Sequence, residues 1–214
     1  MNNFNSVLDE ISEEIDWRKS ELSKLKEIST HLNQDELKIF LKGCLPLIYA
    51  HWEGYVIQSL KNLFQYLNRL ELTSEKFCDV YLTTAYEQTL KNLDESKSFE
   101  KRKKHLLNIY NNLTKKVSLD TKIDTKANLK FEVLKDICIK TNLNFNKFIE
   151  YKEDLNKLVH IRNSISHGEN AYTFENFNDI QKYIDLLENL MLDFYSEIED
   201  LLKEKKYLKE ANEN

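Results

Sequence analysis

Residues 180–201 read IQKYIDLLENLMLDFYSEIEDL, and the apolar side chains in this stretch recur in alternating steps of four and three residues. Their mean period of about 3.5 residues places them on one stripe of an α-helix. A stripe with this period is typical of a helix that packs lengthwise against other helices. The stretch therefore predicts a helical bundle. Its stripe consists of Ile180, Ile184, Leu187, Met191, Phe194, Ile198 and Leu201.

The composition of the whole chain excludes most other fold classes. Three glycines and one proline among 214 residues cannot supply the tight turns of a sandwich, a barrel or a doubly wound sheet. A hydrophobic share of 41% and a charged share of 31% describe a chain that buries a core and stays in solution. Three scattered cysteines indicate free thiols in a reducing compartment rather than a disulfide scaffold. We predict an all-α helical bundle of about six to seven helices.

The periodicity of the apolar residues divides the chain into helices that together form a single domain over all 214 residues. Asn33 or Asp35 can cap the second helix, and Pro46 should kink it because proline lacks a backbone N–H. We expect a basic, more mobile insert at about 94–127 and a frayed tail at about 208–214. The expected helices span about residues 5–30, 35–69, 74–93, 99–113, 129–140, 148 or 152 to 167, and 177 to the 200s.

The net charge of −5 is distributed unevenly. Residues 97–130 contain ten Lys or Arg against three Asp or Glu, a net charge of +7, which leaves −12 for the rest of the chain. The acidic start, MNNFNSVLDEISEE, lacks the basic and apolar regions of a signal peptide. The most apolar stretch, residues 39–56, contains Lys42, His51 and Glu53 and is too short and too charged to span a bilayer. We therefore expect a cytoplasmic protein with no membrane contact.

One predicted helix carries a charged residue among apolar ones. Residues 154–170 read DLNKLVHIRNSISHGEN. The helical period places Arg162 on the same stripe as Leu158 and Val159. Because a guanidinium stays protonated, burying it without a partner is costly. Arg162 must therefore face a carboxylate, a second subunit or a phosphate.

The same helix ends on a histidine. His167 lies one helical turn after Asn163, whose side chain can orient the imidazole, and Gly168 suits the left-handed residue that ends a helix. A cation and a titratable imidazole at one helix end suit phosphodiester cleavage. The histidine can move the proton of a ribose 2′-hydroxyl or of the leaving oxygen, and Arg162 can stabilise charge on the phosphate. Spacing alone favours a blander interpretation, a buried arginine in an ion pair and a histidine that only ends the helix.

Three segments together resemble a known superfamily. Arg162–His167, RNSISH, resembles the R-x4–6-H signature of the HEPN superfamily, whose all-α bundles carry this motif near a helix end. Residues 49–55, YAHWEGY, and residues 124–129, DTKANL, are similar to a prokaryotic branch often found near defence and restriction genes. Gly168 also matches the RN…HG ending of that branch. The resemblance covers roughly residues 35–200.

The resemblance implies a metal-independent endoribonuclease that cleaves RNA by attack of the 2′-hydroxyl and needs no cofactor. Arg162 and His167 would be its catalytic residues, Asn163 a supporting residue, and two copies of the motif would meet in a homodimer. Such an isologous interface supplies two imidazoles, one base and one acid. The cellular role would be that of a defence or toxin nuclease, with an inhibitory partner protein as one means of restraint. Glu169 stands where some HEPN toxins carry a modified tyrosine, so regulation by that route is not expected.

Two further residues have alternative interpretations. Glu53 either forms an ion pair with Arg162 or Lys42, or orients the catalytic pair. His160 and His167 lie on nearly the same helix face, which makes a zinc pair conceivable. Because no cysteine or carboxylate stands at the usual ligand spacing, we predict no metal site.

A basic run on the helix expected at 99–113 also has two interpretations. Its side chains can grip an RNA backbone, with Phe99 and Tyr110 to stack a base, or can form a solvated face, which the sequence favours slightly. Many HEPN domains are inactive, so the alternative function is a non-catalytic module that binds a partner protein, a nucleotide or RNA. A plain structural bundle is a weaker alternative. The basic run consists of Lys101, Arg102, Lys103 and Lys104.

Overall fold

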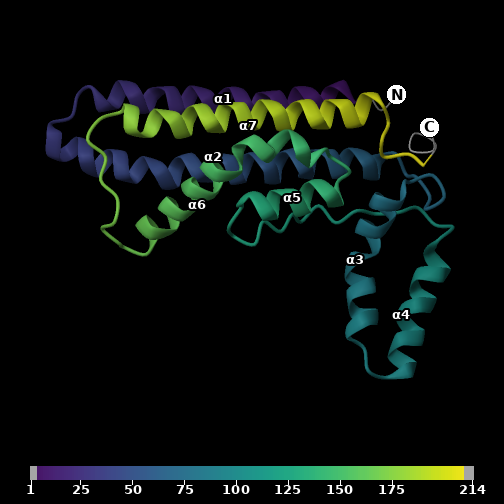
Figure 1. Cartoon of the computed structure of the whole chain (residues 1–214). Coiled ribbons are helices and arrows are strands. Elements are labelled where there is room, and N and C mark those ends of the chain that lie inside the picture. The colour runs from purple at the N-terminus through teal and green to yellow at the C-terminus, as the bar shows by residue number, and fades with distance from the viewer. Residues whose placement is uncertain (1–3, 210–214) are drawn as a thin grey trace.

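The structure, a computed structural model, describes residues 4–209, and the regular elements in this range are helices (Figure 1). The predicted all-α fold is therefore confirmed. In chain order the elements are α1 (Asn5–Ser29), α2 (Gln34–Arg69), α3 (Asp79–Glu95), α4 (Phe99–Asn112), α5 (Phe131–Lys140), the 3₁₀ helix η1 (Phe145–Tyr151), α6 (Lys152–Ser166) and α7 (Asn178–Lys203).

The long helices α1, α2 and α7 run alongside one another, and each packs against the other two, while α5 and α6 lie below them in Figure 1. The predicted stripe of α7 lies in the core, since all of its apolar residues are buried. Trp52 of α2 meets Phe194 of this stripe edge-on, with ring centroids 6.1 Å apart. The 3.5-residue period therefore reflects lengthwise packing of α7 against α1 and α2.

The longest helix, α2, positions part of the candidate site. Its N-terminus is a capping box, in which Asn33 accepts the N–H groups of Asp35 and Glu36 and the Glu36 carboxylate accepts the N–H of Asn33. The predicted cap at Asn33 is thus confirmed. Pro46 lies inside the helix, which continues through it for 36 residues in all. Residues 49–55 of this helix contact α7 through Trp52 and Phe194, and α6 through Tyr49 and Arg162.

Helix α3 begins at Asp79 and not at residue 74 as predicted. The segment before it instead forms an isolated bridge between Phe77 and Leu208. Pairing between residues so far apart in sequence overrides local helical propensity, which is all that the sequence pattern reports. The bridge also attaches Leu208, at the start of the expected frayed tail, to the body. Residues 210–214 of that tail lie outside the described residues.

Helices α3 and α4 form a hairpin that projects from the body as an arm (Figure 1). No residue of α4 is buried. The chain then returns to the body, where Val117 donates its N–H to the Leu72 carbonyl at 2.8 Å and Asn68 exchanges two hydrogen bonds with Leu119. The first part of the insert expected at 94–127 therefore lies in the arm, and the second part is held on the body.

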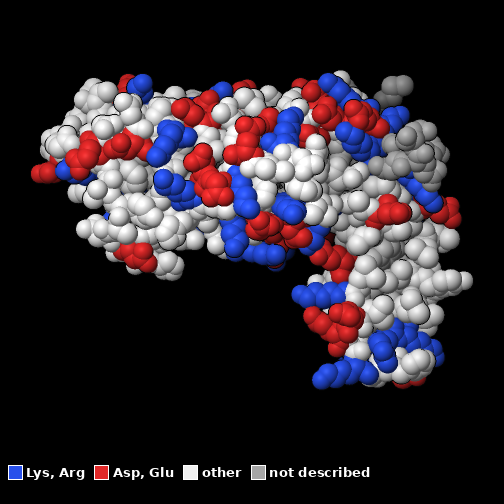
Figure 2. All heavy atoms as spheres, viewed as in Figure 1, with Lys and Arg blue, Asp and Glu red and all other residues white. Residues whose placement is uncertain are grey.

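Charged side chains of both signs are mixed over the body, and several basic ones gather toward the free end of the arm (Figure 2). The predicted basic run at Lys101–Lys104 is exposed there along α4. Among the helices of the described residues, none has both the length and the apolar character needed to cross a membrane.

Candidate functional site

The motif helix α6 ends in a turn that presents His167 to solvent. Gly168 adopts a φ of +76°, and its N–H bonds the carbonyl of Ile165. The N–H of Glu169 bonds the carbonyl of Ser164, which completes a Schellman C-cap. The Ser164 hydroxyl also donates to the Glu169 carboxylate at 2.6 Å and closes the turn a second time. The predicted left-handed glycine after the histidine is confirmed.

Arg162, half-buried on α6, faces an aromatic ring and an amide. Its Cζ lies 4.3 Å from the centroid of the Tyr49 ring on α2, and its Nη1 donates to Asn163 Oδ1 at 2.8 Å. A guanidinium has five N–H donors, and the described residues account for one of them. The remaining donors are available to an anion, which a guanidinium binds best through two parallel hydrogen bonds.

Tyr49 connects the arginine to a buried polar network. Its ring is buried, and its hydroxyl donates to Glu53 Oε1 at 3.0 Å and accepts the N–H of Leu129 at 2.6 Å. The same Glu53 oxygen accepts the hydroxyl of Thr125 at 2.7 Å. Burial raises the pKa of the Tyr49 hydroxyl above its ordinary value, so this group stays protonated and can donate.

The loop at 124–129 reaches the site from the other side. Its backbone turns through two consecutive residues of positive φ, Lys126 at +55° and Ala127 at +50°. The next residue, Asn128, accepts the Nδ2 group of Asn163 at a long 3.5 Å. The structure thus brings together all three segments that carry the resemblance, the loop, residues 49–55 and the motif helix.

Within the described residues, Asn163 lacks the predicted contact with the imidazole, and Glu53 lacks the ion pair that was one of its two predicted roles. The Asn163 amide turns toward Arg162 and the loop at 124–129, and within the described residues no hydrogen bond joins it to the imidazole of His167. The expected orientation of the histidine by this amide is therefore not formed in the single chain. Glu53 accepts hydrogen bonds from two neutral hydroxyls rather than forming an ion pair with a cation.

The loop that follows α6 is anchored to the body. Lys42 of α2, a predicted partner of Glu53, instead donates to the Glu169 carbonyl at 3.2 Å and to Asn170 Oδ1 at 3.3 Å. Farther along the loop, the ring of Tyr172 lies edge-on to His160, with centroids 6.1 Å apart. The end of the motif helix is therefore held against α2.

Other residues of segment 49–55 serve packing. Arg18 of α1 is buried beside Gly54, where an added methyl group would lie 3.4 Å from its Nη2. Its guanidinium pairs with Glu14 and donates to the carbonyl of His51 at 3.1 Å. Gly54 therefore allows the close approach of a side chain of α1.

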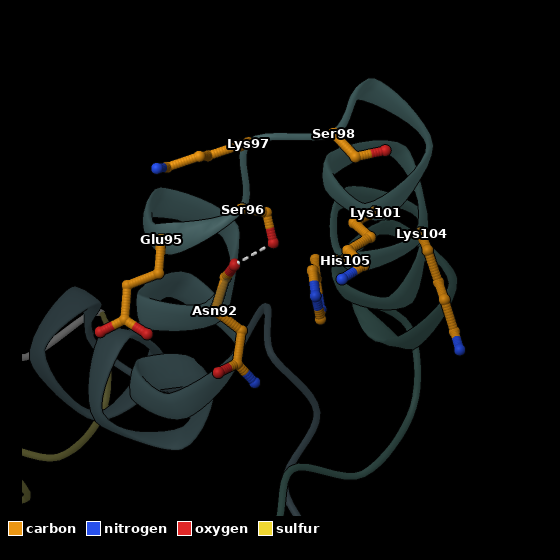
Figure 3. A pocket seen from close by; sticks show the side chains of 8 residues that line it. All are labelled: Asn92, Glu95, Ser96, Lys97, Ser98, Lys101, Lys104 and His105. Atoms are coloured by element: carbon orange, nitrogen blue, oxygen red, sulfur yellow. Dashed lines mark hydrogen bonds between the residues drawn. The ribbon is translucent and has the colours of Figure 1, made fainter.

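The basic run lies on the arm, away from the motif helix (Figure 1). Lys101 and Lys104 line an open hollow between the end of α3 and the start of α4, where the Ser96 hydroxyl donates to the Asn92 carbonyl at 2.5 Å (Figure 3). The structure therefore does not bring the basic run and the motif together within one chain. The large apolar side chains that α4 also exposes are Phe99, Leu106, Leu107 and Tyr110.

The sequence prediction missed three residues of the site, Tyr49, Thr125 and Asn128. All three lie in segments that carry the family resemblance, but only the folded chain shows that Tyr49 contacts Arg162, Thr125 bonds Glu53 and Asn128 bonds Asn163. One local signal was present. Tyr49 and Glu53 are four residues apart and so share a helix face, which allows their hydrogen bond.

All the segments of this site lie within a region that matches a known protein family. A family model described as RiboL-PSP-HEPN matches residues 13–200, a range that includes the motif helix, residues 49–55 and the loop at 124–129. Neither a curated protein nor a solved structure matches the chain.

Proposed function

Because the chain belongs to the RiboL-PSP-HEPN family, we propose that it is a metal-independent endoribonuclease with Arg162 and His167 as its catalytic residues. The end of α6 supports this most directly. An exposed imidazole follows, on the same helix, a guanidinium with most of its donors available. A cation and a group that can accept and donate a proton are what phosphodiester cleavage requires.

The reaction begins when a neutral His167 removes the proton of a ribose 2′-hydroxyl. The 2′-oxygen attacks the adjacent phosphorus, and Arg162 stabilises the charge that builds on the non-bridging oxygens. A second, protonated imidazole gives its proton to the departing 5′-oxygen as the P–O5′ bond breaks. The products are a 2′,3′-cyclic phosphate and a 5′-hydroxyl end. Protons balance, because one histidine gains the proton that the other loses.

The second imidazole comes from a second copy of the chain. We propose a homodimer in which two α6 ends face each other, since a two-fold axis juxtaposes identical surfaces. The exposure of His167 leaves this edge of the monomer open to such a partner. Light scattering is expected to give twice 25.6 kDa. A monomer at concentrations at which RNA is cleaved would contradict the dimer.

The decisive experiment combines metal removal with one substitution. The wild-type protein, incubated with RNA in excess EDTA, should leave 2′,3′-cyclic phosphate ends that mass spectrometry detects. His167→Ala should lower the cleavage rate by about 10²–10⁴-fold without changing the mass in solution. The variant, purified in the same way, also controls for contaminating nucleases that leave the same ends. Equal cleavage by the two proteins would refute the assignment.

One feature of the geometry favours a second function, a binding module without chemistry. Within residues 4–209 no side-chain hydrogen bond joins the imidazole of His167 to Arg162 or Asn163, so a single chain does not hold the three side chains together. A module would use the free donors of Arg162 to hold an RNA phosphate. RNA binding that depends on Arg162 and persists without cleavage, with or without metal, would identify this function.

A further inference from the structure

We propose that Tyr49 is a positioning residue that fixes the plane of the Arg162 guanidinium, and that the loop at 124–129 fixes Tyr49 in turn. The contacts that carry this inference belong to the fold itself. Its kinetic consequence rests on the nuclease function proposed above.

The first step is the contact between the two side chains. The Arg162 Cζ lies 4.3 Å from the centroid of the Tyr49 ring. A guanidinium is planar, and an aromatic face attracts it while leaving its edge donors free to bind oxygen. Asn163 holds one of those donors at 2.8 Å. The ring and the amide together therefore restrict a long, flexible side chain to a narrow range of orientations.

The second step is the immobilisation of the ring. The Tyr49 hydroxyl is bonded on both sides, by donation to Glu53 and by acceptance of the Leu129 N–H. Glu53 is itself held by the Thr125 hydroxyl. The ring that supports Arg162 is thus fixed to its own helix and to the loop at once.

The third step is the geometry of the loop. Lys126 and Ala127 both occupy the left-handed region, which is unfavourable for residues other than glycine, asparagine and aspartate. Such strain persists where surrounding contacts over-determine the backbone, and it clusters at functional sites. Here the surrounding contacts end on the site: Thr125 bonds Glu53, Asn128 bonds Asn163, and Leu129 bonds Tyr49.

A purely structural role would require less of Tyr49. Tyr55, six residues later on α2, shows such a role, since its hydroxyl donates to the carbonyl of Met191 in the core at 3.1 Å. The guanidinium near its ring, that of Arg18 at 5.7 Å, is already bonded to Glu14 and to the His51 carbonyl. Core packing needs only the apolar atoms of a ring and one partner for its hydroxyl. The Tyr49 hydroxyl has two partners, and its ring bears a cation with free donors.

The first test measures the NMR chemical shift of the Arg162 side chain and does not depend on activity. The side-chain N–H signal of Arg162 should lie upfield in the wild type, because the face of an aromatic ring shields nuclei above it. Tyr49→Phe should keep that shift, and Tyr49→Leu should abolish it. The spectrum is simple, because the arginines of the chain are Arg18, Arg69, Arg102 and Arg162.

The second test is kinetic. Tyr49→Leu should lower kcat on RNA by about 10²-fold, the loss expected when a reacting group is misplaced by about 1 Å. KM should change little, and the shape of the pH profile should stay the same because His167 is untouched. Tyr49→Phe keeps the ring but loses both hydrogen bonds of the hydroxyl, so its kcat should fall between those of Tyr49→Leu and the wild type. Tyr55→Phe, which removes a buried hydroxyl elsewhere on α2, is the matched control and should leave kcat unchanged.

Each outcome decides the proposal. A folded Tyr49→Leu protein with an unmoved Arg162 signal, or with the kcat of an active wild type, overturns it. If Tyr49→Leu does not fold, Thr125→Val, which removes one donor from Glu53, must lower kcat or the proposal fails. If the wild type cleaves no RNA, the nuclease function fails, and the Arg162 signal still decides whether Tyr49 positions the guanidinium.

Discussion

Substitution of Arg162 can separate the effect of its charge on cleavage from the effect of its side-chain packing on stability. Methionine replaces the aliphatic part of this side chain and suits an apolar surface, so Arg162→Met should leave the free energy of unfolding within about 1 kcal/mol of the wild type. The same change removes the cation that stabilises the phosphate. It should therefore lower kcat/KM by about 10²–10³-fold, the usual loss on removal of one such donor.

Urea unfolding and single-turnover cleavage measure the two effects of Arg162→Met separately. Arg162→Lys is the matched control, because it keeps the charge but lacks the planar fork that the Tyr49 ring orients. It should fall between wild type and Arg162→Met. If Arg162→Met cleaves RNA as fast as the wild type, Arg162 has no catalytic role and the structural-bundle interpretation is favoured.

His51 makes the stability of the fold depend on pH. Burial lowers its pKa, Arg18 adds to this, and Glu21, 3.8 Å away, opposes it. Below about pH 6.5 the unfolded chain therefore binds more protons at this residue than the folded chain does. Its contribution to stability is complete above that pH and is lost as the pH falls.

The expected result is a lower urea midpoint at pH 5.5 than at pH 7.5, with a smaller difference in His51→Gln. Glutamine has a similar length and does not titrate in this range, so it isolates the ionisation of the imidazole. An unchanged pH dependence in His51→Gln would show that other groups cause it.

At the scale of the element, two glycines with opposite backbone requirements test the end of α6. Gly168 has a φ of +76°, so Gly168→Ala should destabilise the protein by about 1–2 kcal/mol. Gly43 lies inside α2, where an added methyl group meets nothing within 4 Å. Gly43→Ala should therefore stabilise the protein by about 0.5–1 kcal/mol. Urea midpoints measure both, and changes of the same sign would contradict this account of the cap.

The predictability of an element depends on where its contacts lie. The stripe of α7 and the cap of α2 could be predicted because each depends on residues that are close together in the sequence. The start of α3 could not be predicted, because the Phe77–Leu208 bridge that displaces it joins distant segments. The pairing of α3 with α4, which follow each other directly in the chain, was missed for a different reason. A helix with no buried residue carries no stripe that points to its partner.

The same distinction applies to the candidate site. Arg162, His167 and Gly168 could be predicted because the helical period and the chain order of one segment place them at a helix end. The roles of Tyr49 and Thr125 could not, because a helical wheel of α2 assigns Tyr49 to the core without showing what its face and its hydroxyl meet. Those contacts arise only when α2, α6 and the loop at 124–129 assemble.

At the scale of the whole molecule, the exposed basic run of the arm can be tested as a second RNA-binding surface, separate from the end of α6. Reversing the basic run to glutamate should weaken RNA binding and flatten its salt dependence. The logarithmic slope should fall by about 0.7 for each phosphate of a single strand that the arm no longer neutralises. The rate at saturating RNA should stay the same, because the arm lies away from α6. Binding titrations at several salt concentrations measure this, and an unchanged affinity would identify the run as a solvated face.

Because α4 has no buried residues, the arm should open locally more readily than the body does. Local opening of α4 exposes almost no new apolar surface, so its backbone amides should exchange with deuterium long before those of α2 or α7. In hydrogen–deuterium exchange measured by mass spectrometry, the arm of the free protein should therefore be the most labelled region at early times. A nucleic acid that lay across α4 would slow labelling there, whereas one bound only at the end of α6 would leave the arm labelling freely. The deuterium labelling of the α4 amides therefore shows directly whether nucleic acid is bound to the arm.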